Sequence, residues 1–193
     1  VPSIVFGLFG VGFFIRFVGR NLEAALPGTS GQSWAQPTLL WASATLAVMA
    51  LPVLIVATEE ALRSIPRGLR EASLALGATR LQTIVRVVLP QAVPGILTGV
   101  ILAISRAAGE VAPILFTGAA YYVAQLPHSL QDQFMDLGYH VFILSTQSPD
   151  VDRTRPILYA TVLALLLLTV ALNAVAVVLR AAIRRKWRAA TQT

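Results

Sequence analysis

The chain has 193 residues, of which 56% are hydrophobic and only 12% are charged, and its mean hydropathy is +0.72. An average globular chain is about 25% charged, so this chain cannot cover a water-facing surface, and its composition indicates that a bilayer is its solvent. It contains no cysteine, which excludes disulfides and thiolate metal sites.

The net charge of +6 does not indicate a nucleic-acid partner, because of where the basic residues lie. A group of them follows an apolar run directly, which is where a membrane protein carries its cytoplasmic anchor: Arg180, Arg184, Arg185, Lys186 and Arg188. The sequence also starts inside an apolar run, at Val1, without a signal-peptide pattern, so we expect it to be N-terminally incomplete.

Four stretches qualify, or nearly qualify, as membrane spans, each of which takes about 20 mostly apolar residues. They cover residues 1–18, 38–58, 92–118 and 156–179. The sequence therefore predicts an all-α fold, a polytopic transmembrane helical bundle.

The loops between these stretches differ in charge. Residues 59–90 carry five arginines and the C-terminal tail carries five basic residues, whereas residues 119–155 carry two arginines against four aspartates. Because Lys and Arg concentrate on the cytoplasmic side, we expect 59–90 and the C-terminus to be cytoplasmic and 119–155 to lie outside.

The cytoplasmic segment 59–90 has helical periodicity. Pro66 is typical of a helix start, and Gly77 of a helix end. The sequence predicts two short amphipathic helices, the second ending at Leu89–Pro90. An apolar face recurs at helical spacing along the first part of the segment and is interrupted by Pro66; it is formed by Leu62, Ile65, Leu69, Ala72 and Leu76. Periodicity alone leaves two interpretations open: a helix pair lying on lipid headgroups, or a helix that docks into a groove on a partner.

The spacing of Glu71-Ala72-Ser73, Gly77 and Val87-x-Leu89-Pro90 resembles the EAA motif of bacterial ABC importer permeases. Ser73 stands where the motif has Ala, and Val87 stands where it has Ile. The resemblance implies a coupling helix that sits in a cleft of the ATPase subunit, with the ATPase-coupling residues Glu71, Ala72, Ser73, Gly77, Leu89 and Pro90.

The chain has no ATP site of its own. A phosphate-binding P-loop needs Gly-x4-Gly-Lys-Ser/Thr, and the only lysine here is Lys186. We therefore expect no enzymatic activity and no cofactor on this chain, with ATP used by a partner ATPase subunit.

Two charges lie inside the third apolar stretch, Arg106 and Glu110. Four residues apart on a helix, they would share a face and could pair with each other, or they could line a polar substrate pathway. Gly109, Pro113 and Gly118 indicate an irregular or broken helix around them. Ser105, Thr98 and Thr117 are possible further hydrogen-bond donors.

A wider run from Thr58 to Pro113, together with residues 134–149 and the fourth span, resembles the PstA-type permeases of phosphate ABC importers. The resemblance implies the type I ABC importer permease fold, with 1–193 an incomplete domain of about four spans from an original six. It also implies a multi-pass protein of the bacterial inner membrane that translocates inorganic phosphate. Its partners would be a PstB-type ATP-binding subunit, a sister PstC-type permease, a PstS-type phosphate-binding protein and membrane lipid.

In this interpretation Arg106 contacts the passing phosphate or gates its path, because a guanidinium offers a planar fork to phosphate oxygens. Glu110 would hold Arg106 in place or be protonated.

Other functions remain open: a permease for sulfate or molybdate, a membrane assembly subunit without transport, and a membrane enzyme. A membrane enzyme would need a convergent set of nucleophile, acid and base, and the sequence does not offer one. We predict no metal site, because the loop residues that could supply ligands have no strong ligand spacing: His128, Asp132, Asp136 and His140.

Overall fold

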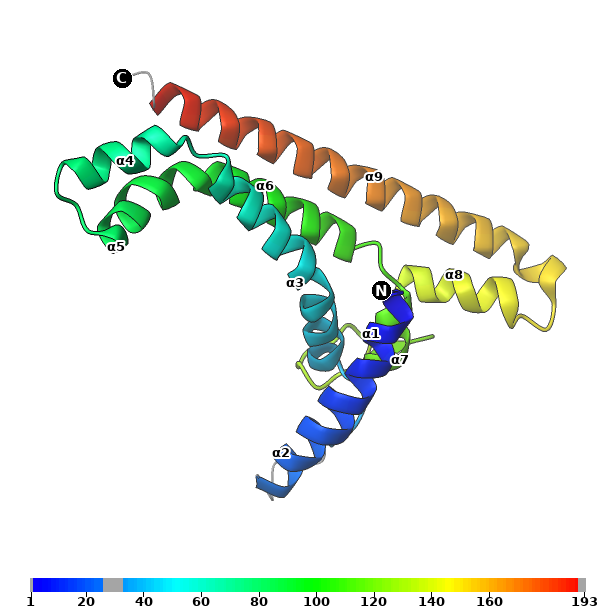
Figure 1. Cartoon of the computed structure of the whole chain (residues 1–193). Helices are drawn as coiled ribbons and strands as arrows, with labels where there is room; N and C mark the ends of the chain where they lie inside the picture. Colours follow the sequence, from blue (N-terminus) through cyan, green and yellow to red (C-terminus); the bar gives the residue numbers. More distant parts are fainter. Residues whose placement is uncertain (1, 26–32, 191–193) are drawn as a thin grey trace. The chain divides into compact units, whose positions relative to one another are not determined.

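The computed structural model describes residues 2–25 and 33–190, which are mostly helical (Figure 1). The helices, in chain order, are α1 (Ser3–Phe9), η1 (Gly10–Gly19), α2 (Arg20–Ala25), α3 (Leu39–Arg63), α4 (Arg67–Ala75), α5 (Arg80–Thr83), η2 (Ile84–Val88), α6 (Leu89–Ala107), α7 (Ala112–Thr117), α8 (Leu137–Thr146) and α9 (Val151–Ala190). Two short strands, β1 (Ala119–Ala120) and β2 (Phe134–Met135), pair in parallel.

Four helical stretches in the described part of the chain are long and apolar enough to cross a membrane: Ser3–Ala25, Leu39–Arg63, Arg80–Ala107 and Asp152–Leu179. Few of their residues are buried within the chain, and none are in the most apolar window of the last stretch. Apolar helices that leave their side chains uncovered fit a lipid environment or further helices. The predicted all-α bundle of about four spans is confirmed.

The helix boundaries differ from the predicted ones in every span. The first two helical stretches end at Ala25 and Arg63, beyond the predicted 18 and 58. The stretch 92–118 is not one helix: α6 ends at Ala107, and α7 starts at Ala112, with Pro113 in its first turn. The break that Gly109 and Pro113 predicted is therefore present. α9 starts five residues before the predicted 156 and continues through the basic tail to Ala190.

The segment 119–155, predicted as an outer loop, contains the additional helix α8. The carboxylate of Asp136 caps it by accepting a hydrogen bond from the Tyr139 N–H at 2.8 Å. Helix caps of this kind satisfy one of the free backbone donors at a helix start. The apolar run that follows Asp136 is too short to cross a membrane, so the sequence did not predict a span there.

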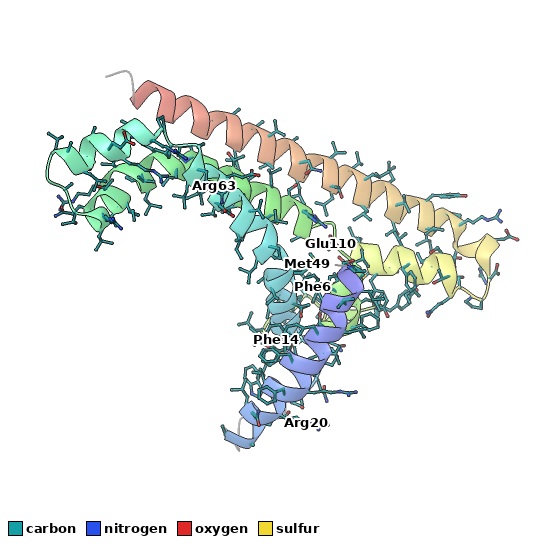
Figure 2. All side chains as sticks on the ribbon, in the orientation of Figure 1. Phe6, Phe14, Arg20, Met49, Arg63 and Glu110 are labelled. Atoms are coloured by element: carbon teal, nitrogen blue, oxygen red, sulfur yellow. The ribbon has the colours of Figure 1, made fainter. Side chains whose placement is uncertain are left out.

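The chain divides into two units, one built from residues 1–49 and 107–170 and the other from 50–106 and 171–193. In the first unit η1, α3 and α7 meet at a glycine: a Cβ on Gly10 would clash with Thr45 and with Thr117. Phe14, on the η1 helix (Figure 2), stacks on Trp41 with ring centroids 6.0 Å apart.

The N-terminus of α3 is held by the loop that carries both strands. The N–H groups of Leu39 and Leu40 donate to the carbonyls of Asp132 and Leu130, both at 2.9 Å. The Thr38 N–H donates to the Thr117 carbonyl at 3.0 Å. The first amides of a helix have no partner within it, so these bonds fix the loop against the start of α3.

In the second unit α3 and α6 approach each other through small residues. A Cβ on Gly95 would lie 2.7 Å from the Cβ of Ala61, and a Cβ on Gly99 would clash with Ala57. Small residues four apart on both helices permit close backbone approach, as in many membrane helix pairs. The seam continues into a small apolar core of Ala61, Ile65, Val88 and Ala92.

Candidate functional site

The segment between α3 and α6 forms two short helices, α4 and α5, that lie beside each other (Figure 1). Pro66 precedes α4 with an extended backbone (φ −53°, ψ 134°). Since the residue before the first helical turn needs no helical conformation, the proline ends α3 and starts a new helix without losing a hydrogen bond. The predicted fresh start at Pro66 is thus present.

Gly77 ends α4. Its φ of +85° lies in the left-handed region, which glycine adopts without steric cost. The Ala78 N–H donates to the Ser73 carbonyl at 3.2 Å and the Gly77 N–H to the Leu74 carbonyl at 3.0 Å. This pair of bonds is a Schellman motif, which closes the free carbonyls of the last helical turn.

Thr79 starts α5 with a capping box. Its hydroxyl accepts from the Gln82 N–H at 3.3 Å, and the Gln82 side-chain oxygen accepts from the Thr79 N–H at 2.9 Å. Only Ala78 separates this cap from Gly77, so both ends of the bend are fixed by local hydrogen bonds.

Two side-chain contacts hold the helix pair together and to the span before it. The hydroxyls of Ser73 and Thr83 lie 2.9 Å apart and join α4 to α5. The Arg70 guanidinium donates to the Leu62 carbonyl at 2.7 Å. This carbonyl, in the last turn of α3, also accepts a long bond from the Ile65 N–H at 3.5 Å, because the proline four residues on has no N–H to donate. Ser73 therefore has a structural role in this geometry, within the predicted coupling motif.

The interruption of the apolar pattern that Pro66 predicted is present, because Pro66 separates α3 from α4. Ile65, before the proline, is buried in the small core. Leu69, Ala72 and Leu76, after it, are exposed, and Leu76 is 89% exposed. Glu71 is exposed on the same short helix. The part of the pattern that carries the EAA-like residues is thus uncovered by the rest of the chain.

The second predicted helix does not end at Leu89–Pro90. It continues through a π-helical turn, η2, into α6: the Leu89 N–H donates to the Ile84 carbonyl, five residues back. A proline inside an α-helix removes one hydrogen bond and clashes with the carbonyl four residues earlier, and a wider π turn just before Pro90 relieves that clash. Leu89 and Pro90 are therefore residues of a continuous helix from Arg80 to Ala107.

The two charges predicted for the substrate pathway occupy different local structures. Arg106 lies in the last turn of α6 with an exposed side chain. Glu110 lies beyond the end of that helix, and its N–H donates to the Ala107 carbonyl at 3.2 Å. The prediction that both share one helix face is wrong, because Ala108 and Gly109 form a turn between them.

Ser105, the third predicted pathway residue, is half-buried, and its hydroxyl donates to the side-chain oxygen of Asn173 in α9. Asn173 is a polar residue within an apolar stretch, and sequence reasoning missed it. Its polarity in the middle of a predicted span was the available signal, because buried polar groups in membrane helices commonly pair across helices.

The other proposed hydroxyl donors are engaged by their own helices. Thr98 donates to the Pro94 carbonyl at 2.8 Å, and Thr117 donates to the Pro113 carbonyl at 2.9 Å. Thr117 is also fully buried, so it does not reach a solvent-filled path. This corrects its place among the possible donors; Thr98 is half-buried and lines a groove beside α3.

Asp132 and His140, in segment 119–155, make structural contacts through their side chains. The Asp132 carboxylate accepts from the N–H groups of His128 and Ser129, both at 2.9 Å, and His140 stacks on Tyr121 with ring centroids 5.1 Å apart. No group of three or more potential metal ligands occurs within residues 2–25 and 33–190.

Comparison of the sequence with known proteins identifies its family. The model of the binding-protein-dependent transport system inner membrane component family matches residues 1–189. The chain belongs to this family, whose members are permease components of the inner membrane.

Individual relatives carry more specific names. The probable ABC transporter permease YqgI of Bacillus subtilis is 42% identical over 117 residues, 61% of this chain and 35% of that protein. The phosphate transport system permease PstA 1 of Mycobacterium tuberculosis H37Rv is 41% identical over 115 residues, 60% of this chain and 32% of that protein. The phosphate transport system permease PstA of Xylella fastidiosa Temecula1 is 34% identical over 188 residues, 93% of this chain and 56% of that protein.

The chain thus spans about a third of the length of the first two relatives and little more than half of the third. No solved structure gives a significant match.

Proposed function

We propose that the chain is the membrane-spanning permease part of an ATP-driven importer that translocates inorganic phosphate, while a partner subunit hydrolyses the ATP. One observation carries the importer assignment. The segment between two membrane-length helices is folded into a capped helix pair that holds Glu71, Ala72 and Leu76 outward.

This helix pair has a surface and a shape that suit a groove on another protein. The end of α4 exposes Ala72, Ala75 and Leu76 beside Glu71, and these small and apolar side chains allow close seating against a protein surface. The bend at Gly77 is closed by hydrogen bonds, so the shape exists before docking and little entropy is lost on binding. A partner ATPase is therefore the occupant that we assign to it, and the chain itself would bind no cofactor.

The cargo assignment has a different basis. Several relatives are named as phosphate transport permeases. This chain carries Arg106 in the last turn of α6, directly before the break between α6 and α7. Non-helical backbone inside a membrane is tolerated where it lines protein or water, and Arg106 would supply the cation that an oxyanion needs there. Ser105 and Glu110 flank it in the sequence.

The remaining partners follow from the same proposal. A sister permease of the PstC type would complete the pathway, an ATPase of the PstB type would drive it, and a binding protein of the PstS type would deliver phosphate to the outer side. The C-terminus would be cytoplasmic in the inner membrane.

The importer assignment is tested by copurification. Full-length permease carrying Glu71→Arg or Gly77→Arg should lose its P-loop ATPase partner, because both substitutions place a large cation on the docking surface. Ser64→Arg adds the same side chain at an exposed position outside the motif and should retain the partner. If the ATPase stays bound to both motif variants, the coupling assignment is wrong.

The cargo assignment is tested by uptake in cells that express the full-length protein with its partners. Radiolabelled phosphate should accumulate, and sulfate and molybdate should not. The Arg106→Ala variant should assemble but lose phosphate uptake. Uptake of sulfate or molybdate instead would identify another oxyanion as the cargo. Normal assembly without any flux in the unmutated protein would point to an assembly subunit.

A further inference from the structure

Two adjacent pockets lie on the second unit, where α3 ends and the helix pair begins. One has a volume of about 540 Å³ and is lined by α3 residues and Arg70. The other, of about 520 Å³, is lined by α4, α5 and η2 residues, among them Arg80 and Ile84. The two pockets share Leu62 and Arg70, so they form one groove along the end of the span.

The groove changes in character along its length. Leu54 and Ile55 line one end and belong to the membrane-length helix Leu39–Arg63. Leu54 lies nine residues before Arg63 and so about 13 Å along the helix from it. The other end is lined by Arg70 and Arg80.

The polar end carries excess positive charge. Arg63, in the lining of the first pocket, is paired with Glu59 at 2.5 Å. Within residues 2–25 and 33–190, no carboxylate forms an ion pair with Arg70 or Arg80, the other two charges of the lining. One Arg70 nitrogen donates to the Leu62 carbonyl. Its Nε is buried and has no hydrogen-bond partner in the described chain. A buried donor without an acceptor costs free energy that a bound anion would remove.

An anion with a hydrocarbon tail fits both ends at once. Guanidinium groups bind phosphate oxygens with charge-assisted hydrogen bonds, and basic pockets at membrane-helix ends are typical sites for anionic headgroups. A soluble partner would not reach Leu54, which lies more than two helical turns into the span, whereas an acyl chain would. We propose that this groove binds one anionic phospholipid, with its phosphate at Arg70 and Arg80 and an acyl chain along Leu54 and Ile55.

The proposal does not depend on the transported cargo. It concerns only a membrane permease whose α3 spans the bilayer. Arg70 and Arg80 are also not among the residues assigned above to the ATPase contact, so loss of lipid and loss of the ATPase are separate readouts.

The experiment uses the full-length permease, purified with its ATPase partner and exchanged into phosphatidylcholine nanodiscs that contain a fixed fraction of phosphatidylglycerol. Phosphatidylglycerol that stays bound on transfer to detergent is counted by native mass spectrometry. Arg80→Gln should weaken retention about fivefold and Arg70→Gln/Arg80→Gln about thirtyfold, from roughly 1 kcal/mol per arginine. Arg67→Gln and Arg86→Gln remove exposed arginines that line neither pocket and should change retention little.

Arg80→Gln alone guards against misfolding of the double variant, because the Arg80 side chain is exposed and makes none of the contacts that hold α4 to α3. Equal retention by all variants, or equal retention of phosphatidylcholine, would overturn the proposal. So would displacement of the lipid by millimolar inorganic phosphate, which would indicate a simple phosphate site. Loss of the ATPase with the lipid retained would assign the groove to the protein partner.

Discussion

Gly68, inside α4, and Gly77, just after it, have different backbone conformations. Gly68 lies within α4 and Gly77 has a φ of +85°, yet a Cβ at either position would meet no atom within 4 Å. Any difference between the two alanine variants therefore comes from the backbone and not from packing. The left-handed conformation costs an L-residue about 1–2 kcal/mol, and glycine inside a helix is roughly 0.5–1 kcal/mol less favourable than alanine.

We accordingly predict opposite effects for the pair. Gly77→Ala should lower the opening free energy of the amides in 76–79 by about 1 kcal/mol, whereas Gly68→Ala should raise that of α4 by about 0.5 kcal/mol. Hydrogen–deuterium exchange of the full-length protein, resolved to peptides of this segment, measures both. Equal changes in the two variants would show that Gly77 is not held in the left-handed conformation.

The hydrogen bond from Ser105 to Asn173 gives a second prediction at this scale. The two residues lie 68 positions apart and join α6 to α9. Interhelical hydrogen bonds in membrane proteins contribute about 0.6 kcal/mol on average and at most about 1.7 kcal/mol. A double-mutant cycle with Ser105→Ala and Asn173→Leu, followed by unfolding in detergent, should give a coupling energy in that range. Strict additivity of the two changes would mean that the bond contributes nothing.

Among the secondary-structure elements, α3 and α6 approach each other closely at the seam in the second unit. A side chain at Gly99 would have to displace Ala57, and overpacking a close contact costs about 1–3 kcal/mol. We predict that Gly99→Leu lowers the melting temperature of the full-length protein in detergent. Gly12→Leu is the matched control, because a Cβ at Gly12 meets nothing within 4 Å; it should leave the melting temperature nearly unchanged. A comparable loss in both variants would argue against the seam.

Single proline and glycine residues in the sequence were sufficient to predict part of this architecture. Pro66 and Gly77 predicted the start and end of α4, and Gly109 and Pro113 indicated the break after α6. These residues restrict or widen the backbone of their own position, so their effect does not depend on distant parts of the chain.

Other features depend on contacts that a single sequence does not display. Continuation through Pro90 requires the π turn of η2, and the short strands require the loop to be held at the start of α3 by Leu39 and Leu40. The Ser105–Asn173 hydrogen bond could be predicted only by someone who knew that α6 and α9 are adjacent. Periodicity also did not show that Pro66 divides the apolar face into a buried half and an exposed half.

For the whole molecule, the proposed orientation can be tested with introduced thiols. The 193 residues contain no cysteine, so an introduced cysteine is the only thiol among them that can be labelled. In intact cells, a membrane-impermeant maleimide should label Gln125→Cys, in the outer segment, and should label Ala75→Cys and Ala181→Cys only after permeabilisation. All three positions are exposed. Labelling of Ala181→Cys from outside would reverse the assignment of the C-terminus.

The helix from Arg80 to Ala107 runs for 28 residues without a loop, which makes it a rod about 42 Å long. Its first turn is tied to α4 by the Ser73–Thr83 contact, and Arg106 lies at its far end. A rod converts a small tilt at one end into a larger displacement at the other: about 10° at the α5 end moves Arg106 by about 7 Å. In the importer proposed above, this helix would act as a lever arm that converts a small tilt at the ATPase contact into a larger displacement at Arg106.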